Sequence, residues 1–286
     1  MKILVTGAGG FVGQVLTKQL AANGHDVTGL DLGEQIEGAK DWFQIDPNLV
    51  LKTSRLPQEI EAIIHLAQSP AYRQGADGEE AVFHTNVAMH ASLLKYASNI
   101  GVKHFTSAST GTVYEPFTNG MAETDTVSPT GYYGASKYAA EVLSNAYKNR
   151  MGICNIRPFF VYGPHQKNML MARLIENISA GNEVGLPEKG EGLIFVPSYV
   201  DDVARCFAKS VEDKWEGAVN VASPEAVSFQ TVLETISQVT GKPLNLKRKG
   251  EGPKHPIVPD ITKLKTLMDV KKFIDFKTGI QNTVTA

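Results

Sequence analysis

Apolar positions along the first half of the chain alternate between two periods. Ile3–Val5 is a short apolar run typical of a buried strand. After a glycine-rich turn, apolar residues recur on one face of a predicted helix that ends at Asn23-Gly24, and Asp26–Asp31 predicts a second strand. The order strand, helix, strand indicates two parallel strands joined by a right-handed crossover.

The same alternation continues to residue 158. Apolar runs predict strands at 62–66, 104–108 and 152–157 with a minor strand at 42–45, and helical periodicity predicts helices at 79–100 and 131–150. Strands that alternate with helices in this way predict an α/β fold with a Rossmann-type doubly wound parallel sheet.

Beyond Pro158 prolines and glycines become more frequent and the predicted elements become shorter: helices at 201–211 and 228–240, and a strand at 217–221. We therefore predict two domains. The Rossmann domain comprises 1–160 with a return segment at about 193–222. A smaller C-terminal α/β lobe for the substrate comprises 161–192 and 223–286.

The composition is that of an ordinary globular protein. Of 286 residues, 42% are hydrophobic and 20% charged, and the net charge of −2 argues against nucleic acid as a partner. No segment is long and apolar enough to be expected in a membrane. Cys154 and Cys206 lie in apolar segments without metal-ligand spacing, so we expect a reducing cytoplasm and no metal.

Three small residues, Gly7, Gly10 and Gly13, lie in the turn after the first strand and at the start of the first helix. Glycines there let the backbone approach a pyrophosphate at the helix N-terminus, and Gly13 lets the helix pack closely on the sheet. We therefore predict a dinucleotide site that includes Phe11 and Val12, the first helical residues. The alternative is a turn of structural value only.

Asp31, at the end of the second predicted strand, indicates the type of dinucleotide. Its carboxylate can accept hydrogen bonds from the adenosine ribose and would repel a 2′-phosphate. No Arg or Lys follows in Leu32–Glu34, so the sequence favours NAD over NADP. The alternative is a solvated turn aspartate.

Tyr133 and Lys137 are spaced by four residues and share one face of a predicted helix. A phenol with a pKa of about 10 is a poor base, but a nearby ammonium and the nicotinamide would favour the phenolate. A third polar group beside Tyr133 would steady a carbinol oxygen. The pattern alone leaves Ser109 and Thr110 as alternatives.

Taken together, these motifs resemble the extended short-chain dehydrogenases/reductases of the NAD-dependent sugar epimerase/dehydratase branch, such as the UDP-glucose 4-epimerases. The resemblance covers nearly the whole chain. The segments that carry it are 6–13, Asp31, 64–67, 86–87, 113–114, 133–137 with Glu141, 157–158, 161–164, 200–204 and 220–224. It implies NAD as the cofactor and Thr110 as the third catalytic group beside Tyr133 and Lys137. It also implies cofactor contacts at Leu66, Ala67, Asn86 and Pro158, with His65 either packing or in contact.

Several positions depart from the family pattern. Gly111-Thr112 replaces the acidic pair of the relatives that dehydrate sugars, which argues against dehydration. Phe160 and Phe195 stand where epimerases usually carry a diphosphate-binding Asn and Arg, and we expect both residues to contact the substrate. The loop with Arg248 and Glu251 resembles the family loop that meets the diphosphate and the nucleoside ribose, although a solvated basic loop is the alternative.

We therefore expect an NAD-dependent sugar-nucleotide epimerase, acting at C4 through a transient keto intermediate. The alternatives are a 4-keto-sugar reductase or an alcohol dehydrogenase on a non-nucleotide substrate, which Phe160 and Phe195 would favour. A non-catalytic dinucleotide-sensing regulator is a third, disfavoured by Tyr133 and Lys137. The resemblance also implies a homodimer through the helices near 80–100 and 131–150.

Overall fold

A computed structural model describes residues 1–45, 53–252 and 255–286. The chain forms two compact units. The first contains Met1–Pro116, Thr126–Pro158 and Ala204–Val219, and the second contains Phe117–Asp125, Phe159–Val203 and Asn220–Ala286.

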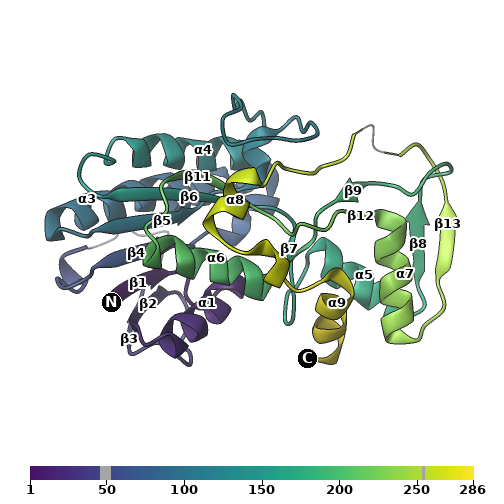
Figure 1. The fold of residues 1–286 in the computed structure, drawn as a ribbon, viewed down its shortest axis with the longest axis horizontal. Coiled ribbons are helices and arrows are strands. Elements are labelled where there is room, and N and C mark those ends of the chain that lie inside the picture. Colours follow the sequence, from purple (N-terminus) through teal and green to yellow (C-terminus); the bar gives the residue numbers. More distant parts are fainter. Residues whose placement is uncertain (46–52, 253–254) are drawn as a thin grey trace. The chain divides into compact units, whose positions relative to one another are not determined.

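Seven strands of the described chain form one sheet in the order β11-β6-β5-β4-β1-β2-β3 (Figure 1). They are β1 (Lys2–Thr6), β2 (Asp26–Asp31), β3 (Asp41–Gln44), β4 (Ala62–His65), β5 (His104–Ala108), β6 (Gly152–Pro158) and β11 (Gly217–Val221). The β1–β2, β1–β4, β2–β3, β4–β5 and β5–β6 pairs are parallel. This order confirms the predicted doubly wound sheet, whose strand order reverses between β1 and β4.

Helices connect these strands and cover both faces of the sheet (Figure 1). They are α1 (Phe11–Ala22), α2 (Glu79–Phe83), α3 (His90–Ile100), α4 (Tyr132–Asn145) and α6 (Val200–Glu212). The helix predicted at 79–100 is interrupted by a π-helical stretch at His84–Met89. Periodicity did not predict it, because one wider turn barely alters the spacing of apolar residues. The helix predicted to reach residue 150 ends at Asn145.

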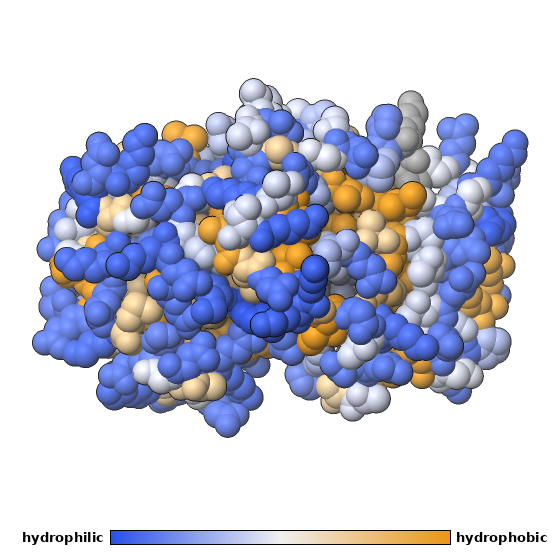
Figure 2. All heavy atoms as spheres, viewed as in Figure 1, coloured by the Kyte–Doolittle hydropathy of each residue, from blue (hydrophilic) through white to orange (hydrophobic). Residues whose placement is uncertain are grey.

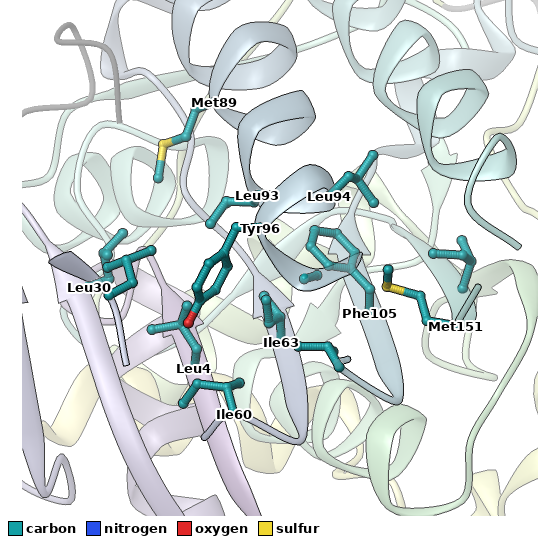
Figure 3. Close-up of a cluster of buried hydrophobic side chains, with 14 residues drawn as sticks. Leu4, Leu30, Ile60, Ile63, Met89, Leu93, Leu94, Tyr96, Phe105 and Met151 are labelled. Carbon is teal, nitrogen blue, oxygen red and sulfur yellow. The ribbon is translucent and has the colours of Figure 1, made fainter. Parts of the chain in front are cut away.

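The core of the first unit lies between the sheet and α3. Leu93 and Tyr96 on α3 pack against Leu4 and Ile63 of the central strands and Phe105 of β5, all buried (Figure 3). The Tyr96 hydroxyl donates to the Pro57 carbonyl, so the polar end of this ring is satisfied. Apolar burial on this face is the main stabilising contribution to the unit.

The second unit is built from short elements. They are β7 (Val161–Tyr162), β8 (Glu183–Leu186), β9 (Ile194–Phe195), β10 (Ser198–Tyr199), β12 (Val227–Ser228), β13 (Asn245–Arg248), α5 (Leu170–Ser179), α7 (Phe229–Thr240), α8 (Thr262–Leu267) and α9 (Phe276–Thr285). The strands pair as β10-β7, β12-β9 and β13-β8. Buried side chains from α5, α7 and α9 form the core of this unit.

The return of the chain to the first unit begins later than the predicted segment at about 193–222. It spans Ala204–Val219, because β9 and β10 pair with β12 and β7 of the second unit. Residues 117–125 also belong to the second unit, where the Asn220 amide donates to the Met121 carbonyl at 2.9 Å.

Hydrophilic residues predominate on the face in Figure 2, with hydrophobic residues scattered among them. None of the helices in the described part of the chain combines the length and apolarity that crossing a bilayer requires. Exposed large apolar side chains include Phe83 on α2 and Val142 on α4.

We predict that Leu93→Ala lowers the free energy of unfolding by about 2–5 kcal/mol, because it opens a cavity in a close-packed core. Lys95→Ala on the same helix is the matched control, since Lys95 is exposed. Urea denaturation followed by circular dichroism measures both. Equal effects of the two substitutions would contradict the assignment of this core.

Candidate active site

Gly7 begins the glycine turn after β1 and has a positive φ of 69°. A Cβ atom there would lie 2.7 Å from the Ala67 nitrogen, so only glycine fits against the segment after β4. The Gly7 N–H donates to the Leu30 carbonyl at 2.9 Å. The turn is therefore held between β2 and the end of β4.

Gly13 allows α1 to start directly on this turn. A Cβ atom on Gly13 would lie 2.0 Å from the Gly7 carbonyl oxygen, a distance that no side chain can adopt. Gly10 is the N-cap of α1, and no side chain caps the helix. Phe11 and Val12 are the half-buried first residues. Backbone N–H groups at the start of such a helix favour a phosphate, so this cradle fits a dinucleotide.

The Asp31 carboxylate lies at the end of β2, beside the glycine turn. It accepts hydrogen bonds from the Gly9 N–H at 2.8 Å and the Leu32 N–H at 2.6 Å. A carboxylate has about four acceptor positions, so it can also accept bonds from ribose hydroxyls. Asp31 therefore braces the turn and suits the dinucleotide type expected from the sequence.

Leu66 and Ala67 follow β4 at the point where the strand order reverses. The Leu66 N–H donates to the Thr6 carbonyl at 3.0 Å and the Ala67 N–H to Thr6 Oγ1 at 3.3 Å. Both residues thus lie at the sheet edge where α/β folds bind ligands. His65 is buried, with Nδ1 2.6 Å from Thr6 Oγ1, and burial lowers its pKa well below the ordinary value. It is a neutral packing residue in this structure.

Asn86 is buried in the π-helical stretch. Its Nδ2 donates to the Ser136 hydroxyl at 3.0 Å, and that hydroxyl donates to the Tyr133 carbonyl at 2.8 Å. These two bonds tie the first turn of α4 to the neighbouring helix. The contacts of Asn86 are therefore structural, and its expected cofactor contact stays a prediction.

Tyr133 lies in the first turn of α4 and is half-buried. Its hydroxyl donates to Gln68 Oε1 at 2.9 Å and is also hydrogen-bonded to Thr110. The ring packs against Tyr72, with 5.0 Å between ring centroids. Burial raises the pKa of Tyr133 above its ordinary value, and the bonds to Thr110 and Gln68 oppose that rise.

Lys137 is buried one turn further along α4. Its Nζ donates to the Ala108 carbonyl at 3.0 Å, and burial lowers its pKa to about 8. The sequence predicted that this ammonium lowers the pKa of Tyr133. Burial is the largest influence on the pKa of both groups, and the predicted effect of the ammonium on the phenol stays a prediction.

The two candidate hydroxyls after β5 point to different partners. Ser109 donates to the buried Glu141 carboxylate. Thr110 accepts from the Thr112 N–H at 3.2 Å, shares a 2.9 Å bond with the Thr112 hydroxyl, and bonds Tyr133. The geometry therefore brings Thr110, and not Ser109, to the phenol.

A buried ion pair fixes α4 against β6. Arg157 donates from Nε and Nη2 to the two Glu141 oxygens at 2.9 and 2.6 Å, and from Nη1 to the Tyr114 hydroxyl at 2.6 Å. Both charges are buried, and a fork of this kind satisfies them with defined geometry. Pro158, which ends β6, is half-buried.

Phe160 and Phe195 pack against one another in the second unit, with ring centroids 4.8 Å apart. Phe160 is half-buried and has a positive φ of 42°. Phe195 is fully buried in the core of its unit. The predicted substrate contact of Phe195 is therefore corrected: its apolar ring is used for packing and is closed to a ligand.

Arg248 lies on the exposed strand β13. Its Nη1 donates to the Pro187 and Gly190 carbonyls, and its Nη2 to Gln230 Oε1, each at 3.0 Å. These bonds orient the guanidinium, and the Nε–H remains as a further donor. Glu251 is exposed in the loop that follows.

Gln68 and Tyr72 were missed by the sequence analysis although both contact Tyr133. Gln68 lies three residues beyond the end of β4, at the same sheet edge as Leu66 and Ala67. That position was the one signal available, since polar residues beyond the carboxyl ends of strands commonly line sites.

The comparisons with known proteins agree with this geometry. Residues 3–222 match the NAD dependent epimerase/dehydratase family. The chain belongs to this family, and NAD is its cofactor. It is therefore an NAD-dependent enzyme of the extended short-chain dehydrogenase type, as the sequence motifs predicted.

Two curated relatives and two solved structures illustrate the likeness. The chain is 28% identical to a UDP-glucuronate 4-epimerase of Thermodesulfobacterium geofontis, covering 98% of this chain and 94% of the relative. It is 31% identical to a UDP-glucose 4-epimerase of Mycolicibacterium smegmatis, covering 85% and 84%.

Among solved structures, the Thermus thermophilus UDP-glucose 4-epimerase complex with NAD has 27% identity and a TM-score of 0.83, and the Bacillus cereus UDP-glucuronic acid 4-epimerase complex with NAD has 26% and 0.86. Each comparison covers 100% of this chain and 98% of the other. The likeness therefore extends over both units.

We predict that Gly13→Ala weakens NAD binding at least about tenfold, because the new methyl group forces α1 away from the glycine turn. Gly185→Ala is the control, since a Cβ there meets no atom within 4 Å. Calorimetric titration with NAD measures the dissociation constants. Unchanged NAD affinity in folded Gly13→Ala protein would contradict the assignment of the glycine turn and the start of α1 as the dinucleotide site.

Proposed function

We propose that this enzyme inverts C4 of a nucleoside-diphosphate sugar through a transient 4-keto intermediate. The observation that carries the proposal is the convergence of Tyr133 and Thr110, with Lys137 one turn away, in the same unit as the glycine cradle. The 4-epimerases among the relatives support the choice of reaction and of substrate class.

In this proposal Tyr133 is the general base. Its phenolate takes the proton of the C4 hydroxyl, while the Thr110 hydroxyl hydrogen-bonds the same substrate oxygen. NAD, when bound, would supply the acceptor for the C4 hydride and the source of the hydride returned to the other face of the keto sugar. Tyr133 then gives its proton back to the same C4 oxygen, so protons and electrons balance over the cycle.

Lys137 carries the positive charge that favours the phenolate. Because burial lowers its pKa to about 8, it is protonated below that pH and loses its charge as the pH rises through 8. Lys137 would also help to hold the nicotinamide ribose when NAD is bound. The buried ion pair of Glu141 and Arg157 keeps α4 in place throughout the reaction.

In the second unit, Arg248 is the group proposed to meet the substrate diphosphate. Its guanidinium is already oriented by three acceptors, so little side-chain entropy is lost when it binds an anion. Glu251 would accept bonds from the nucleoside ribose, and the half-buried Phe160 would offer an apolar contact.

A 4-keto-sugar reductase or a dehydrogenase of a non-nucleotide alcohol is the second candidate. The observation that favours it is that Phe195, an apolar and buried residue, stands at the position where epimerases usually carry an arginine. An epimerase turns over without added cofactor, whereas a reductase consumes reduced cofactor stoichiometrically.

We also propose a cytoplasmic homodimer. Phe83 on α2 and Val142 on α4 are about half exposed, at 48% and 52%, and would be covered by a second copy. Cys154 and Cys206 are buried thiols, as suits a reducing compartment.

We predict that Tyr133→Phe lowers kcat on the order of 10²–10⁴-fold and leaves NAD affinity unchanged, because it removes only the acid–base group. The readout is interconversion of UDP-glucose with UDP-galactose, and of the two UDP-hexuronates, without added NADH. Full activity of this variant would refute the role of Tyr133. Stoichiometric consumption of added NADH by the unmodified enzyme would instead identify the reductase.

We predict that Arg248→Ala raises KM for a UDP-sugar by about tenfold to a hundredfold with a small change in kcat, because a charge-assisted contact is lost. Lys247→Ala is the matched control on the same strand; Lys247 pairs with Glu183 at 3.3 Å, a surface contact of little energetic value. If both variants behave alike, Arg248 does not bind the diphosphate.

A further inference from the structure

We propose that Gln68 is a positioning residue for the acid–base step: its side-chain amide holds the Tyr133 oxygen in both protonation states. The inference rests on the proposed role of Tyr133 and adds a residue that the family motifs do not contain. It follows from the contacts of the segment after β4.

The amide of Gln68 reaches the reacting end of the phenol. The Tyr133 hydroxyl donates to Gln68 Oε1 at 2.9 Å, while Thr110 bonds the same phenol oxygen. Gln68 is exposed and Tyr133 half-buried, so this contact lies on the open side of the phenol. A substrate hydroxyl must approach the phenol oxygen to within a similar distance.

The backbone around Gln68 is fixed on both sides. Before it, the Ala67 N–H is bonded to Thr6 Oγ1 at 3.3 Å. After it, the buried Ser69 caps a short 3₁₀ helix by accepting from the Ala71 N–H at 3.2 Å. A side chain on a braced segment can orient its partner, because little of the contact is lost to motion.

The same segment supports the Tyr133 ring. Tyr72 packs against it with ring planes 38° apart, and the Tyr72 hydroxyl accepts from Arg73 Nε at 2.8 Å. Rotation of the Tyr133 ring is therefore limited by Tyr72, and the position of its oxygen is limited by Gln68 and Thr110.

An amide is suited to a group that gains and loses a proton. The neutral phenol donates its hydrogen and needs an acceptor, which Gln68 Oε1 supplies. A phenolate needs donors, and a half-turn of the amide presents Nε2–H₂ at the same place. Neither a carboxylate nor an apolar side chain of this length offers both a hydrogen-bond acceptor and a hydrogen-bond donor.

The test compares Gln68→Met and Gln68→Glu in the NAD-bound enzyme. Both keep the length of the side chain, but the first removes the amide and the second replaces its donor by a negative charge. Gln74→Met is the control, an exposed glutamine on the same loop.

We expect Gln68→Met to lower kcat for the UDP-sugar about tenfold with KM and NAD affinity nearly unchanged. In both variants the phenolate loses a hydrogen-bond donor, so the pKa of Tyr133 rises and the acid limb of the kcat–pH profile moves to higher pH. The move is larger in Gln68→Glu, because the phenolate there also faces a negative charge. Tyrosine ring ¹³C NMR, assigned with Tyr133→Phe, must report the same direction for the phenol titration.

Unchanged kcat and an unshifted acid limb in both variants would overturn the proposal. A rise in KM alone would also overturn it, because it would make Gln68 a substrate contact. An increase in kcat would overturn it as well, because Gln68 would then hinder the acid–base step instead of positioning the phenol for it. These outcomes differ from failure of the proposed function, in which Tyr133→Phe itself stays active.

Discussion

The close approach of α1 to the turn after β1 is the constraint on which the cofactor site depends. Gly13 contacts the Gly7 carbonyl so closely that any side chain would separate them, and Gly7 contacts the segment after β4 in the same way. These contacts place the start of a helix, with its free N–H groups, at the point where the strand order reverses. The Asp31 carboxylate completes the arrangement from β2.

The catalytic helix is held by polar contacts on several sides. Asn86 and Ser136 fix its first turn, and the Glu141–Arg157 pair fixes its middle. Buried polar contacts of this kind stabilise little when compared with apolar packing, but they tolerate few alternative geometries. An acid–base group requires such precision, since small displacements from its partner reduce the rate.

The first unit could be predicted largely from the sequence, whereas in the second unit the helix at α7 was predicted but the short strands and their pairing were not. The strands of the central sheet are apolar runs separated by clear helices, so their order follows from local pattern. The second unit is built from two- and four-residue strands such as β9 and β12, whose pairing joins residues far apart in the chain. Phe195 shows the consequence. Its position in the family pattern predicted a substrate contact, but the pairing of β9 with β12 buries its ring in the core of the second unit.

By itself, the sequence determined the glycine turn, the acid after β2 and the four-residue spacing of Tyr133 and Lys137, because each is a local property of one or two elements. The family resemblance implied Thr110 beside the phenol, but only the tertiary structure decided that Ser109 turns to Glu141 and that Gln68 contacts Tyr133. Those contacts join residues tens of positions apart. They depend on the packing of β4, β5 and α4, which local periodicity does not encode.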